Sequence, residues 1–87
     1  MNIFVPIKIK EMAKYGYHRF YDSMVRYENN LRFHAKPRNH GKDTGIMLHA
    51  EIVSRDKFEH ERHNVITDPK ILKEELIRIK SLIHHDY

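Results

Sequence analysis

The last quarter of the sequence constrains the fold most, because it predicts an amphipathic helix with a defined start. Asp68 is a good N-cap, and Pro69 suits the first helical position, where no backbone N–H is needed. Six apolar side chains then fall within an arc of about 140° on the helical wheel: Ile71, Leu72, Leu76, Ile79, Leu82 and Ile83. A chain of 87 residues has room for one domain, so we expect this face to pack against a sheet within residues 1–87.

Two segments show the alternation of apolar and polar residues that is typical of strands with one buried face. Residues 3–9 carry Ile or Val at every second position, and Pro6 cannot donate to a ladder, which favours an edge strand. Residues 46–53 form a second clear alternation, and after a hairpin turn residues 58–66 return as a strand with a polar middle. Residues 31–35 predict a further short strand.

Residues 10–29 follow a helical period instead. Their apolar and aromatic side chains, with Leu31, gather on one face of the wheel at Met12, Ala13, Gly16, Tyr17, Phe20, Met24 and Tyr27. The order of elements is then strand, helix, short strand, hairpin and helix. We therefore predict an α+β fold, in which a small antiparallel sheet (an edge strand plus a hairpin) has two helices packed on one face.

The positive charge is concentrated in one half of the chain. Lys and Arg number 16 against 12 Asp and Glu, a net charge of +4. Residues 1–45 hold nine basic and four acidic residues, a net of +5, whereas residues 46–87 hold seven and eight, a net of −1. Residues 29–42 contain no acid, and their Pro and Gly predict a basic loop over residues 34–45. A chain that needed only solubility would intersperse the two signs.

This basic segment points to nucleic-acid binding, because phosphate contacts need Lys and Arg on a surface that can follow the backbone. We predict a non-enzymatic RNA-binding module. Its phosphate contacts are expected at Arg32, Lys36, Arg38 and Lys42, with His34 and His40 assisting and with Arg19 and Arg26 extending the track. Neutralising about four to six phosphates would make the affinity fall steeply with salt.

Several other classes of site are excluded by composition and spacing. The sequence has no cysteine, which excludes disulfides, zinc–cysteine sites and thiol catalysis. His60 and His63 lie three apart on a predicted strand and would point to opposite faces, so we expect no metal site and no cofactor. No apolar run approaches the about 18 residues of a membrane span. Residues 1–9 are too short for a signal peptide, so we expect a cytoplasmic protein without membrane contact.

A rival function is inhibition of an enzyme by protein–protein contact alone. It would present Tyr15, Tyr21 and Ile77, because Tyr combines buried area with a polar tip and Ile77 lies off the apolar stripe of its helix. A homodimer through an edge strand is also compatible with the sequence.

A second rival is a small histidine-dependent ribonuclease, which would need an acid and a base that converge on the substrate. If Val53 faced Phe58 across the hairpin turn, Glu51 would oppose His60, and His49 would oppose Arg62. Such cross-strand pairs are more often structural than catalytic. We therefore expect no enzyme.

The chain resembles the accessory proteins of large tailed phages in its size, its lack of cysteine and its basic segment NNLRFHAKPRNHGK. Among these it is similar to the small RNA-binding inhibitors of toxin–antitoxin endoribonucleases, the TifA type. The resemblance covers the whole chain in size and charge. It implies a non-catalytic protein of the host cytoplasm that binds RNA and, with that RNA, holds the toxin inactive. It assigns no site residue.

Overall fold

The structure is a computed structural model that describes the backbone of residues 3–84 and the side chains of residues 3–80. The elements are β1 (Ile3–Val5), a 3₁₀ helix η1 (Ile9–Tyr15), β2 (His18–Phe20), β3 (Ser23–Glu28), β4 (Leu31–His40), β5 (Asp43–Arg55), β6 (Glu61–Val65) and α1 (Pro69–His84). Within residues 3–84, six strands form one antiparallel sheet that is accompanied by these two helices. The predicted α+β class with an antiparallel sheet is confirmed.

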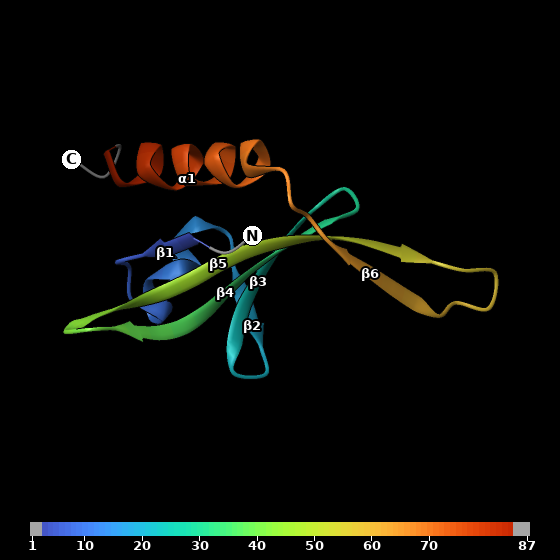
Figure 1. The fold of residues 1–87 in the computed structure, drawn as a ribbon, viewed down its shortest axis with the longest axis horizontal. Coiled ribbons are helices and arrows are strands. Elements are labelled where there is room, and N and C mark those ends of the chain that lie inside the picture. The colour runs from blue at the N-terminus through green and yellow to red at the C-terminus, as the bar shows by residue number, and fades with distance from the viewer. Residues whose placement is uncertain (1–2, 85–87) are drawn as a thin grey trace.

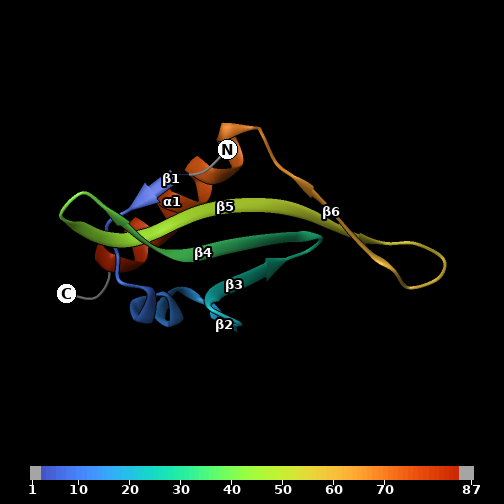
Figure 2. The same cartoon turned by 60° about the horizontal axis from the view of Figure 1, so that its bottom comes forward.

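The sheet is built around β5, its longest strand. The strand order is β1-β5-β4-β3-β2, and β6 pairs with β5 beyond the end of β1 (Figure 1). β1 therefore lies at an edge, as Pro6 predicted, although the strand ends at Val5 rather than at Ile9. The β5–β6 hairpin extends away from α1 and from the rest of the sheet in both views (Figures 1 and 2).

Three two-residue turns connect β2, β3, β4 and β5, and the first residue of each turn has a positive φ. These residues are Tyr21 (57°), Asn29 (56°) and Gly41 (65°). The helix predicted over residues 10–29 is therefore wrong. Only Ile9–Tyr15 is helical, as a 3₁₀ helix that ends at Gly16 with φ 92°. The aromatic and β-branched residues that follow also suit strands, and they form β2 and β3 instead.

The loop predicted over residues 34–45 is also wrong, because β4 and β5 continue as a ladder to the pair His40↔Asp43. Pro37 is tolerated inside β4 because β3 pairs only as far as Ala35, which leaves one side of β4 without a neighbouring strand. The basic residues of this segment therefore stand on a paired hairpin rather than on a loop.

The turn between β5 and β6 is organised by Asp56. Its Oδ1 accepts the backbone N–H of Phe58 at 2.9 Å and that of His60 at 3.0 Å. Because the turn spans residues 56–60, Val53 faces His63 rather than Phe58, and the predicted hairpin register is wrong.

One apolar core lies between the sheet and the helices. Its members are Val5, Met12, Tyr15, Tyr17, Phe33, Ala35, Ile46, Leu48, Ala50, Ile66, Leu72 and Ile79. The helix predicted at the end of the chain is confirmed: Asp68 Oδ1 accepts the N–H of Lys70 at 3.0 Å, as an N-cap does, and Leu72 and Ile79 are fully buried. The apolar face of α1 thus covers one face of the sheet.

Candidate nucleic-acid interface

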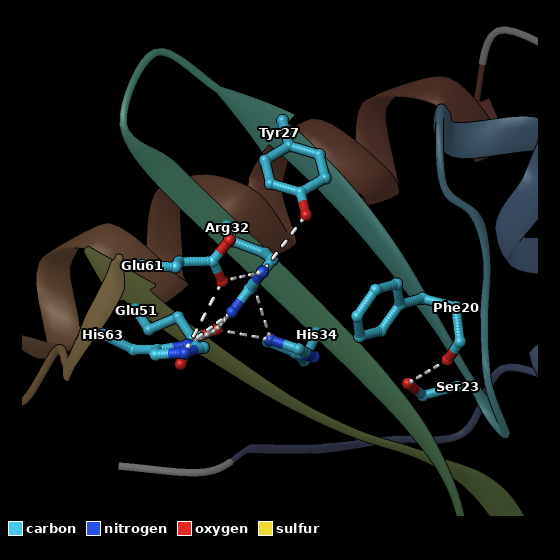
Figure 3. A network of polar contacts seen from close by, with 8 residues as sticks. All are labelled: Phe20, Ser23, Tyr27, Arg32, His34, Glu51, Glu61 and His63. Atoms are coloured by element: carbon cyan, nitrogen blue, oxygen red, sulfur yellow. Dashed lines mark hydrogen bonds and ion pairs between the residues drawn. The ribbon is translucent and has the colours of Figure 1, made fainter. Parts of the chain in front are cut away.

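The other face of the sheet is turned away from α1 and is mainly polar, although Val25, Met47, Val53 and Val65 also point to it. Even-numbered residues of β4 and odd-numbered residues of β5 point to it, opposite to core residues such as Phe33 and Leu48. We call it the open face; it carries His18, Phe20, Tyr27, Arg32, His34, Lys36, Arg38, His40, His49, Glu51, Glu61 and His63. Figure 3 shows the central members of this set in front of the sheet, with α1 behind it.

Arg32 stands at the centre of the open face and is only 3% exposed. Its Nε donates to Glu51 Oε1 at 2.6 Å, and its Nη1 donates to Glu61 Oε1 at 3.0 Å and to Tyr27 Oη at 3.2 Å (Figure 3). Its Nη2 donates to His63 Nδ1 at 2.5 Å. One guanidinium thus joins β3, β4, β5 and β6. We call this cluster, with His34, the Arg32 network.

At each histidine of the network one ring nitrogen has two polar contacts, and the shorter one indicates where the ring proton lies. His63 Nδ1 is 2.5 Å from Arg32 Nη2 and 3.3 Å from Glu51 Oε1; because an arginine can only donate, this nitrogen accepts and the proton is on Nε2, 3.5 Å from Glu61 Oε1. His34 Nε2 is 2.7 Å from Glu51 Oε1 and 3.1 Å from Arg32 Nε; because an ionised carboxylate can only accept, this nitrogen carries a proton and donates to Glu51. His34 Nδ1 is then a buried nitrogen without a hydrogen-bond partner among the described residues.

The two central charges of the network are fixed at neutral pH. Burial would raise the pKa of Glu51, but the hydrogen bonds from His34 and Arg32 outweigh it and lower that pKa to about 2. Burial would lower the pKa of Arg32, whereas its bonds to Tyr27 and Glu51 raise it. A carboxylate with so low a pKa is a weak base, so this cluster favours a structural role over general base catalysis.

Exposed aromatic rings surround the Arg32 network. The side chains of Phe20 and Tyr27 are 38% and 48% exposed, and each ring centroid lies 5.8 Å from the guanidinium carbon of Arg32. The ring of His18 stacks on Tyr27 at 5.9 Å, and the Tyr21 ring meets Phe20 edge-on at 4.8 Å. These rings offer flat apolar surfaces to solvent next to a cation, an arrangement on which nucleic-acid bases can stack.

The end of the β4–β5 hairpin carries the unpaired positive charge of the open face. We call it the basic tip; it comprises Lys36, Arg38, His40 and Lys42. All four residues are exposed, and within residues 3–80 no ion pair involves Lys36, Arg38 or Lys42. Arg38 is six residues beyond Arg32 along β4, a distance of about 20 Å.

Between the rings and the basic tip lies a pair of stacked histidines. The ring of His49 is parallel to that of His34, with 4.7 Å between centroids and 3° between planes. Burial lowers the pKa of His49, and the nearby His34 and Lys36 lower it further. His49 is therefore neutral at physiological pH and adds a flat, uncharged surface to this part of the face.

Arg26 and Tyr15, which the sequence analysis placed in binding surfaces, are committed to the core side of the sheet. Glu75 of α1 is buried and accepts hydrogen bonds from Tyr17 Oη at 3.0 Å and from Arg26 Nε at 2.8 Å. Arg78 donates to Glu75 Oε1 at 2.5 Å and to the backbone oxygen of Tyr15 at 2.6 Å. These contacts tie α1 to β3 and η1, and Tyr15 belongs to the buried core.

The structure therefore divides the residues predicted to bind RNA or a partner. The basic tip brings Lys36, Arg38, His40 and Lys42 together, whereas Arg32 and His34 are buried in the Arg32 network. Arg19 pairs with Met24 on the core-facing side and donates to the backbone oxygen of Tyr21 at 3.4 Å. Tyr21 is 84% exposed in the β2–β3 turn and Ile77 is 63% exposed on α1, so Tyr15, Tyr21 and Ile77 do not form one surface.

The cross-strand pairs predicted for a ribonuclease, Glu51–His60 and His49–Arg62, are wrong, because the β5–β6 register places neither pair opposite. Glu51 faces Val65 in that ladder. Among the side chains of residues 3–80, no group of three or more His, Cys, Asp or Glu is arranged to hold a metal ion.

Phe20, Tyr27, Glu61 and His63 were missed as members of a site. The first two had been assigned to the buried stripe of a helix that does not exist. One signal could have placed them: the Asn29–Asn30 pair, with residues of strand character on both sides, is typical of a hairpin turn.

No helix in the described part of the chain is long and apolar enough to cross a membrane. Comparison of the chain with protein-family models, with curated proteins and with solved structures found no match in any of the three. The function is therefore argued from the open face itself.

Proposed function

We propose that this protein binds single-stranded RNA on the open face, with phosphates at the basic tip and unpaired bases against the exposed rings. The observation that carries the proposal is that Lys36 and Arg38 stand on the same face of the sheet as the rings of Phe20 and Tyr27, with Lys42 in the turn that ends their hairpin. Phosphate contacts supply affinity, and rings accept bases of any sequence; together they are the usual parts of single-strand recognition.

The Arg32 network supports the proposal because it holds the exposed rings of Phe20 and Tyr27 in place. Tyr27 Oη accepts a hydrogen bond from Arg32, and the same guanidinium lies against the ring of Phe20. Rings that are already ordered lose little conformational entropy when a base stacks on them. Lys36 lies four residues from Arg32 along β4, about 13 Å, so a strand lying along β4 would reach both rings and cations.

We propose binding without cleavage, because Glu51 remains ionised and bound to Arg32 and His34, which leaves it poorly suited to take a proton from a 2′-hydroxyl. The resemblance to phage inhibitors extends the proposal: RNA held on the open face would act with this protein to keep a toxin endoribonuclease inactive in the host cytoplasm.

The experiment that tests the proposal measures RNA affinity against salt, using fluorescence anisotropy of a labelled, unstructured oligouridine. Three phosphate contacts predict a slope of log affinity against log salt of about −2, or an about 20-fold loss between 50 and 200 mM salt. The variant with Lys36, Arg38 and Lys42 all replaced by alanine should bind weakly and show little salt dependence. Its thermal stability should match the unmodified protein, since these side chains are exposed.

The matched control replaces three exposed lysines of α1, Lys70, Lys73 and Lys80, with alanine. It removes the same net charge from the side of the molecule opposite to the open face. The proposal requires this variant to bind RNA nearly as well as the unmodified protein. Equal losses in the two triple variants, or no binding by the unmodified protein at low salt, would refute it.

A further inference from the structure

A recess lies beside the basic tip, between the β4–β5 hairpin and the start of η1. Its volume is about 290 Å³, and its wall includes Ile9 and Pro37, with the polar side chains of Asn39 and Thr44. This volume is at the lower end of the range for ligand sites, which fits a single nucleotide better than a large cofactor.

The charge lining this recess is all positive. Lys8, Lys10 and Arg38 border it, no Asp or Glu does, and within residues 3–80 none of the three forms an ion pair. A second recess, of about 310 Å³, lies against α1. Its arginines, Arg26 and Arg78, are already bound to Glu75. The three cations that border the recess beside the basic tip are therefore free to take an anion.

Gly45, which borders the recess, allows the end of β1 and Pro6 to approach the hairpin closely. A Cβ built on Gly45 would lie 2.3 Å from the backbone oxygen of Val5 and 3.0 Å from the Cα of Pro6. Because β1 leads directly into Lys8 and Lys10, this approach brings their positive charge against the hairpin.

We propose that this recess binds one unpaired nucleotide of the RNA, with its base against Ile9 and Pro37 and its phosphate among Lys8, Lys10 and Arg38. The inference rests on the proposed function, and Arg38 links the two sites because it belongs to the basic tip and also borders the recess. A strand that follows the open face past Arg38 turns over the hairpin, and its next nucleotide enters the recess. Asn39 and Thr44 supply hydrogen bonds to the base edge.

The test fills the recess without changing charge. Thr44→Trp places a large side chain in it from an exposed strand position, and Thr67→Trp, at an exposed position between β6 and α1, is the matched control. Thr44→Trp should weaken binding of the labelled oligouridine about fivefold or more, as expected for the loss of one held base. The magnitude of the salt slope should fall by at most about 0.7, because one phosphate is lost from Lys8, Lys10 and Arg38, whereas Thr67→Trp should bind like the unmodified protein.

A second variant keeps the proposal testable if Thr44→Trp does not fold, as judged by circular dichroism. Replacing Lys8 and Lys10 with alanine should reduce the magnitude of the salt slope by about 0.7, since both lysines contact the one phosphate of the held nucleotide. Free uridine monophosphate should shift the backbone amide signals of residues 8–10 and 44–45 in the unmodified protein, and these shifts should disappear in the double variant.

The outcomes separate the recess from the open face. If the recess variants bind RNA normally while the basic-tip variant does not, the recess proposal is wrong and the proposed function stands. If the unmodified protein binds no RNA, both are wrong. Equal weakening by Thr44→Trp and Thr67→Trp also refutes the recess, since only one of them fills it.

Discussion

Replacing Glu51 with glutamine tests whether the Arg32 network holds the sheet together. The substitution keeps the shape of the side chain but removes the charge that neutralises Arg32, which is almost fully buried. Glu61 still lies 3.0 Å from Arg32 Nη1, but its carboxylate is about a third exposed and pairs through a weaker, partly solvated contact. The substitution therefore mainly removes the buried ion pair between Arg32 and Glu51.

The pKa of Glu51 gives the magnitude. The pKa falls from an ordinary value of 4.5 to about 2 in the folded protein, and a difference of this size corresponds to about 3 kcal/mol of folding free energy at neutral pH. That figure agrees with the about 3–5 kcal/mol lost when one partner of a buried pair is removed. In a domain of this size, about 3 kcal/mol lowers the melting temperature by about 12–24 °C.

The direction of the change in the Glu51 pKa determines how the stability of the fold depends on pH. Because the folded pKa lies below the unfolded one, the stabilisation is complete above pH 4.5 and is lost as the pH falls towards about 2. Urea unfolding followed by circular dichroism should show Glu51→Gln about 3 kcal/mol less stable near pH 7, with the gap narrowing in acid.

Glu61→Gln is the control for that experiment, because it removes a more exposed partner of the same guanidinium and should cost less than about 1 kcal/mol. A loss in Glu51→Gln below about 0.5 kcal/mol, or a gap that stays constant down to pH 2, would show that the Arg32–Glu51 pair does not stabilise the sheet.

Two further substitutions test RNA binding on the open face and the packing of the edge strand β1 against β5. Phe20→Ala removes a half-exposed ring and should weaken binding of single-stranded RNA by about 1–3 kcal/mol, five- to over a hundredfold; binding of duplex RNA, whose bases are stacked inside, should not change in the same anisotropy assay. Gly45→Ala places a Cβ against the backbone of β1 and should cost about 1–3 kcal/mol in urea unfolding, as overpacking does. A Gly45→Ala protein with normal stability would mean that β1 can move away from β5 freely.

The helix at the end of the chain and the positive charge of the basic tip could be predicted, because both depend on neighbouring residues. Asp68 and Pro69 mark the helix start through local hydrogen bonding and a fixed φ, whatever the rest of the chain does. The excess of Lys and Arg in residues 29–42 is likewise visible without knowing the fold. The backbone conformation of that segment was mistaken, and so was the exposure of Arg32 and His34, which are buried in the Arg32 network.

The secondary structure of residues 17–27 could not be predicted from the spacing of apolar residues, because that spacing fits both a helix and strands. Tyr17, Phe20, Met24 and Tyr27 lie three or four apart as on a helix, yet aromatic residues also favour strands. What decides between the two is a turn at Tyr21 with positive φ, a conformation that bulky residues rarely adopt and that the sequence does not announce.

The Arg32 network could not be predicted for a different reason, which is that it depends on register. Arg32 and Glu51 are separated by 19 residues, and Arg32 and His63 by 31. A change of one residue in the β4–β5 turn or the β5–β6 turn would move one of these side chains to the other face. The turn at Asp56 sets the last of these registers, and the sequence analysis assigned that turn wrongly.

The late position of α1 in the chain has a consequence for synthesis on the ribosome. The hairpins from β2 to β5 join neighbouring segments, so they can pair while translation continues. Ile46 and Leu48, however, lack the part of the core that Leu72 and Ile79 supply until α1 has emerged. A nascent chain that pauses before Pro69 therefore presents a formed sheet whose apolar face is covered by η1 alone and whose edges are free, the condition in which neighbouring chains associate. This risk ends when α1 has been synthesised and packs on the apolar face of the sheet.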